Sequence, residues 1–94
     1  MRKISKESAD SIIFGNVFKK SNTEVIEVVG GTRMFLHGNP IAEKIDGKIR
    51  ITNSGWFSNV TKERLNSIPN VSISQVKDQW FLNGNLWDGS WIEI

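Results

Sequence analysis

The side chains that could carry acid–base chemistry are few in this chain of 94 residues. Its single histidine, His37, lies in a Gly-Asn-Pro turn, and the local spacing places no serine or carboxylate beside it. A catalytic histidine needs a nucleophile or an orienting partner within hydrogen-bonding reach. We therefore interpret His37 as a turn residue, and we predict no catalytic residue and no enzyme activity.

Carboxylates near the C-terminus offer a second route to acid–base chemistry, through a paired acid and base. The candidates are Asp78, Asp88 and Glu93, of which Asp88 is the most attractive. Asp88 precedes Gly89, however, and this dipeptide is typical of a tight turn, in which the aspartate accepts backbone N–H bonds and the glycine takes a positive φ. The turn interpretation is the better one.

Metal and cofactor sites lack their usual ligands in this sequence. The chain has no cysteine and one histidine, which excludes disulfides and thiolate chemistry and speaks against zinc. The Gly30-Gly31 pair lacks the following Lys-Ser/Thr of a phosphate-binding loop. The sequence predicts no metal and no cofactor.

Tryptophan provides the first candidate binding site. Large aromatic side chains are core anchors by default, but four indoles in so small a domain are not all expected to be buried. An exposed tryptophan is typical of interaction hot spots and of platforms on which bases stack. We predict partner-binding roles for Trp56, Trp87 and Trp91, and we expect Trp87 and Trp91, which flank a turn, to be partly exposed.

Basic residues provide the second candidate site. In the strand predicted over Lys48–Thr52, apolar and polar side chains alternate, so Lys48 and Arg50 point away from the buried face that Ile49 and Ile51 occupy. Phosphate oxygens of a nucleic acid are the ligands that such a patch would hold. Further basic residues nearby are Lys44, Lys62 and Arg64, and the predicted phosphate-binding set is Lys48, Arg50 and Arg64.

The charge balance favours a plainer alternative, in which these side chains only keep the surface soluble. Nine basic against six acidic residues up to Arg50 give +3, and three against four afterwards give −1. This total of +2 is low for a dedicated nucleic-acid binder, and Glu43 and Asp46 cancel part of the local field.

The elements that must position these residues follow from periodicity and turn dipeptides. A helix is predicted from the N-cap Ser5 to about Phe18, with Gly15 as a point where it can stop early. Two hairpins follow, and a second helix is capped by Ser58 or Thr61 and ends before Pro69. The hairpin strands are Thr23–Val29 with Thr32–Leu36 across Gly30-Gly31, and Ile41–Ile45 with Lys48–Thr52 across Asp46-Gly47.

Three short strands then form a meander with turns at Lys77-Asp78, Asn83-Gly84 and Asp88-Gly89. The order of elements predicts one α+β domain over residues 1–94, with two short helices packed on one face of an antiparallel sheet. The charged stretch Met1–Ala9 lacks the apolar run of a signal peptide, and no later segment approaches a membrane span. Together with the lack of cysteine, this predicts a cytoplasmic protein without membrane contact.

The C-terminal third resembles a pattern in small uncharacterised proteins of tailed bacteriophages. The residues that carry the resemblance are Thr61, Arg64-Leu65-Asn66, Ile68, Val71, Ile73, Trp80, Leu82-Asn83-Gly84, Trp87-Asp88-Gly89 and Trp91. The resemblance implies a phage accessory protein that acts in the cytoplasm of an infected bacterium, and it assigns no role to any residue.

Three hypotheses of function remain. The first is a protein that binds a host or phage protein through an aromatic patch, as in host takeover or in the blocking of a defence. The alternative is a weak, sequence-independent nucleic-acid binder, and the third is an enzyme, which the missing chemical groups disfavour. A structural component of the virion is a further alternative. The sequence leaves the oligomeric state open.

Overall fold

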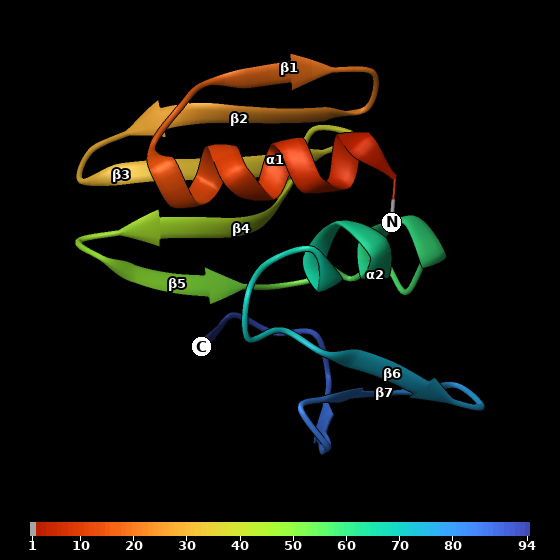
Figure 1. The fold of residues 1–94 in the computed structure, drawn as a ribbon. Coiled ribbons are helices and arrows are strands. Elements are labelled where there is room, and N and C mark those ends of the chain that lie inside the picture. The colour runs from red at the N-terminus through yellow and green to blue at the C-terminus, as the bar shows by residue number, and fades with distance from the viewer. Residues whose placement is uncertain (1) are drawn as a thin grey trace.

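Two sheets and two helices make up the protein in a computed structural model that describes residues 2–94 (Figure 1). The predicted α+β fold is confirmed. The elements are α1 (Lys3–Phe14), β1 (Phe18–Lys20), β2 (Thr23–Val28), β3 (Gly31–Leu36), β4 (Asn39–Ile45), β5 (Lys48–Ile51), α2 (Asn59–Asn66), β6 (Ile73–Val76), β7 (Gln79–Leu82), β8 (Asn85–Trp87) and β9 (Ile92–Glu93). Within residues 2–94, no helix has the length and apolarity that crossing a membrane requires.

The larger sheet is antiparallel, with the strand order β1-β2-β3-β4-β5-β9. Both predicted hairpins are present, since β2 pairs with β3 and β4 pairs with β5. Asp46 and Gly47 both have positive φ values, as a two-residue hairpin turn of this kind requires. A short strand that the sequence did not predict, β1, extends the sheet beyond β2.

The first helix is shorter than predicted at its C-terminus and longer at its N-terminus. Arg2 occupies the N-cap position without a capping side-chain bond, and Ser5 is buried inside the helix. Gly15 ends the helix, because its N–H donates to Ser11 O in a left-handed C-cap. Phe18 therefore belongs to β1 rather than to the helix.

Both helices lie on the same face of the larger sheet (Figure 1). Thr32 on β3 donates a side-chain hydrogen bond to Ile12 O of α1, and Lys44 on β4 donates one to Ile13 O. Lys44 therefore lies on the helix face, and the expectation that it shares a patch with Lys48 and Arg50 is wrong. The opposite side of the sheet, which neither helix covers, is called the open face below.

The C-terminal segment differs from the predicted meander in its last strand. β6, β7 and β8 form a separate three-stranded sheet. β9 instead returns to the larger sheet and pairs with β5, with Ile92 opposite Ile51 and Glu93 opposite Arg50. The turn at Asp88-Gly89 thus connects two sheets.

Candidate binding groove

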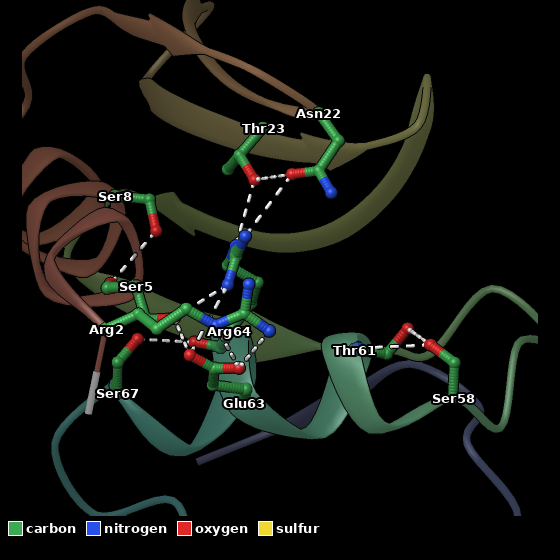
Figure 2. Close-up of polar contacts among 10 residues, drawn as sticks. All are labelled: Arg2, Ser5, Ser8, Asn22, Thr23, Ser58, Thr61, Glu63, Arg64 and Ser67. Atoms are coloured by element: carbon green, nitrogen blue, oxygen red, sulfur yellow. Dashed lines mark hydrogen bonds and ion pairs between the residues drawn. The ribbon is translucent and has the colours of Figure 1, made fainter.

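The buried residue Arg64 fixes α2 against α1 and β2, on the helix face of the sheet. It is 1% exposed and donates hydrogen bonds to Ser5 Oγ at 2.8 Å, Thr23 Oγ1 at 3.0 Å and Asn22 Oδ1 at 3.3 Å (Figure 2). Glu63 Oε1 lies 3.8 Å from its Nη1 atom. Arg64 is therefore a structural residue, and its predicted contact with phosphate is wrong because solvent does not reach it.

Burial and charge act in opposite directions on Glu63, the acidic member of this cluster. Burial favours the neutral carboxyl, but hydrogen bonds from Arg2 and Ser5 and the charges of Arg2 and Arg64 outweigh it and lower the pKa below 4.5. Burial disfavours the charged guanidinium of Arg64 and so lowers its pKa, and the negative charge of Glu63, which raises that pKa, offsets this only in part.

Acid should weaken the fold through this carboxylate. Because the folded pKa of Glu63 is lowered, its contribution to stability is present above pH 4.5 and is lost as the pH falls through the folded pKa. Urea unfolding followed from pH 7 down to pH 3 should show a smaller loss of stability for Glu63→Gln than for the wild type. An equal loss in both proteins would show that the Glu63 carboxylate does not contribute.

The loop between β5 and α2 is held by hydrogen bonds over its first part, from Asn53 to Trp56. Asn53 is buried, its N–H donates to Gly89 O at 3.0 Å, and its side-chain oxygen accepts from Gly55 N at 2.8 Å. Trp56 N donates to Asn53 O at 2.9 Å, and the hydroxyl of Ser54 donates to Pro40 O. These hydrogen bonds hold the loop backbone without any contribution from the indole of Trp56.

The first turn of α2 follows directly after this loop. Ser58 is the N-cap, as one of the two predicted alternatives had it. Its Oγ accepts a hydrogen bond from Thr61 N at 3.2 Å and lies 2.9 Å from Thr61 Oγ1 (Figure 2). The preceding residue, Phe57, packs edge-on against the buried Trp80, with 5.1 Å between the ring centroids.

A groove of about 380 Å³ runs between this loop, the start of α2 and the turn from β3 to β4. Its lining is Leu36, His37, Asn39, Ile41, Trp56, Ser58, Val60 and Thr61, and none of these side chains is acidic, lysine or arginine. Trp56 is 60% exposed at its edge, and Phe57 beside it is 52% exposed. We call this feature the Trp56 groove.

Sequence reasoning identified Trp56 but not the other walls of the groove. His37, interpreted as a turn residue, has a positive φ in the turn from β3 to β4 and contributes to the lining. Leu36 and Ile41 come from the strands on either side of that turn, about 20 residues before Val60. These residues come together only because α2 packs on the sheet, and no local sequence motif predicts that packing.

The two remaining predicted tryptophans have different surroundings. Trp87 is 6% exposed, because it lies opposite Trp80 in the small sheet and its Nε1 donates to Ser90 O at 3.0 Å. Its predicted exposure is therefore wrong. Trp91 is 40% exposed, as predicted, and lies on the open face with Arg50 5.5 Å from its ring centroid.

The predicted basic residues are separated by the sheet. Lys48 and Arg50 lie on the open face, and Arg64 lies on the helix face. Arg50 is not a free cation either, because its Nη2 atom is 2.6 Å from Glu43 Oε2. The structure thus brings two of the three residues, Lys48 and Arg50, to the same face, and Arg50 alone lies beside Trp91.

The fold and the groove define a small α+β protein with a surface groove whose lining contains no acidic, lysine or arginine side chain, and with an exposed aromatic edge. The model of the family described as Kyanoviridae Gp96 protein matches residues 1–93, and the chain belongs to this family of phage proteins. No curated protein and no solved structure matches the chain. A phage protein was expected, and the match extends over nearly the whole chain rather than its last third alone.

Proposed function

We propose that this phage protein is a non-catalytic binding protein, which engages a protein of the phage or of its host through the Trp56 groove. The observation that carries the proposal is the exposure of Trp56, 60%, on a loop whose backbone is fixed by hydrogen bonds. An exposed indole leaves a large apolar area in water, and a domain of this size has little apolar surface to spare for its own stability.

The composition of the groove suits a protein ligand. Trp56 and the apolar side chains behind it form a centre that a partner can desolvate, and polar residues such as Asn39 and Ser58 form the rim. Since the loop is fixed in advance, binding costs little ordering of this side of the interface. The groove is small, so we expect it to take one or two apolar side chains from a short segment of the partner.

We propose a biological role that suits this mode of action. A protein that acts by binding alone changes its target by covering a surface or by holding it in one conformation. Host takeover and the blocking of a bacterial defence are the roles that fit a phage protein of this kind, and we propose an infected host cell as its place of action.

Site-specific photocrosslinking tests the proposal directly. A photoreactive phenylalanine derivative at position 56 is compared with the same group at Val29, which is 97% exposed in the turn between β2 and β3. In lysate of infected cells, we expect position 56 to give a distinct protein adduct that unlabelled wild-type protein suppresses. Identical adducts from both positions would contradict the proposal, because they would reflect exposure alone.

Truncation of the indole should remove the interaction without unfolding the protein. Central tryptophans of interfaces often contribute 2 kcal/mol or more, so Trp56→Ala should compete for the adduct about 30-fold less well than the wild type. Its thermal unfolding should change little, because the side chain is mostly in solvent. Equal competition by variant and wild type would remove Trp56 from the site.

A further inference from the structure

The open face carries a row of side chains that reaches across four neighbouring strands. Arg33 on β3 lies opposite Glu43 on β4, and Glu43 lies opposite Arg50 on β5. Trp91 precedes β9 by one residue and points to the same side as Glu93, which is paired with Arg50. With adjacent strands about 4.8 Å apart, the row is about 14 Å long.

A buried carboxylate orients the two arginines of this row. Glu43 is 2% exposed, and each of its oxygens accepts hydrogen bonds from one guanidinium. Arg33 bonds to Oε1 through Nε and Nη2, and Arg50 bonds to Oε2 in the same way, with all four distances between 2.6 and 3.2 Å. Each guanidinium group uses its Nε–Nη2 edge for Glu43, so its Nη1 group can donate to a further acceptor.

The aromatic member of the row stands beside this pair. The guanidinium of Arg50 lies 5.5 Å from the centroid of the Trp91 ring, and 40% of Trp91 is exposed. Lys48, which lies two residues before Arg50 on the same face of β5, is exposed. Oriented guanidinium groups, a lysine and an open indole are the groups that hold a phosphate chain and stack a base.

We propose that the open face binds single-stranded nucleic acid, with Trp91 stacked on a base and with Arg33, Arg50 and Lys48 on neighbouring phosphates. A single strand is favoured over a duplex because only unpaired bases offer their faces to an indole. The row and Lys48 together contain three cations and two carboxylates, Glu43 and Glu93, which gives a net charge of +1. Binding is therefore weak and independent of sequence, and the row covers only a few nucleotides.

Fluorescence anisotropy of a labelled oligothymidine of about ten nucleotides tests this site. Three phosphate contacts predict that log K falls with log salt with a slope of about −2, since each contact on a single strand contributes about −0.7. Lys48→Gln should reduce that slope by about 0.7, and Trp91→Ala should weaken binding about tenfold. Trp91→Phe keeps an aromatic face and should retain most of the affinity.

The controls separate this proposal from the Trp56 groove. Trp56→Ala should leave oligothymidine binding unchanged, and Trp91→Phe should leave the crosslink from position 56 unchanged. Variants of Arg33 or Arg50 disturb a buried carboxylate, so the test relies on Lys48 and Trp91. No binding at low salt, tighter binding to duplex DNA, or wild-type binding by both Trp91→Ala and Lys48→Gln would each overturn the proposal.

Discussion

Replacing Arg64 with alanine should lower the melting temperature of the protein by roughly 10 to 40 °C. Removal of one member of a buried, hydrogen-bonded charged cluster costs about 3 to 5 kcal/mol. A domain of this size has a total stability of about 5 to 14 kcal/mol, and each kcal/mol corresponds to roughly 4 to 8 °C. The loss is large because the side chain of Arg64 joins α2 to Ser5 of α1 and to Thr23 of β2.

Circular dichroism of thermal unfolding measures this effect, and Arg2→Ala is its control. Arg2 also pairs with Glu63, at 2.9 Å, but its side chain is 63% exposed. Exposed ion pairs contribute at most about 1 kcal/mol, so Arg2→Ala should shift the melting temperature by only a few degrees. Similar shifts for both variants would mean that the fold does not depend on the buried position of Arg64.

Arg64 also shows where sequence reasoning stops. On a short, mostly polar helix, an arginine carries the local pattern of a surface residue, and it was predicted to bind phosphate. Its hydrogen-bond acceptors lie about 40 to 60 residues earlier in the chain. Only the packing of α2 on α1 and β2 brings them together, and no turn dipeptide or hydrophobic periodicity predicts that packing.

Local signals, by contrast, predicted the hairpins well. The dipeptide Asp46-Gly47 specifies a turn whose two strands are adjacent in sequence, so the turn and the pairing are one prediction. The pairing of β9 with β5 joins Ile92 to Ile51, and the turn at Asp88-Gly89 before it does not reveal the partner strand. The same limit applies to Trp87, whose burial depends on its register opposite Trp80.

The candidate sites show the same difference between local sequence signals, which predict structure, and long-range packing, which the sequence does not reveal. Alternation along β5 correctly placed Lys48 and Arg50 on the side away from Ile51, because the alternation of a strand is a local property. The orientation of Arg50 by Glu43 and its approach to Trp91 required the pairing of β4, β5 and β9. Trp56 was a candidate from its residue type, but the groove beneath it arises from tertiary packing.

The contact between Gly89 and the loop that carries Trp56 leads to the second large effect. Gly89 has a φ of +88°, and its carbonyl accepts hydrogen bonds from Asn53 N and from the hydroxyl of Thr52. A Cβ atom at this position would lie 2.2 Å from the side-chain amide of Asn53, which is buried. Gly89→Ala must therefore separate the turn before β9 from the β5–α2 loop or displace Asn53.

Urea unfolding should show that Gly89→Ala loses roughly 2 to 5 kcal/mol, as the sum of an unfavourable positive φ and a steric overlap. Gly84→Ala is the matched control, since Gly84 has a φ of +86° and open space around its missing Cβ atom. It should lose only the backbone part, about 1 to 2 kcal/mol. If the proposed function is correct, Gly89→Ala should also weaken the crosslink from position 56, because Asn53 anchors the backbone of Trp56. Equal destabilisation by the two variants would show that the turn and the loop can separate without cost, and the Trp56 groove would then not be preformed.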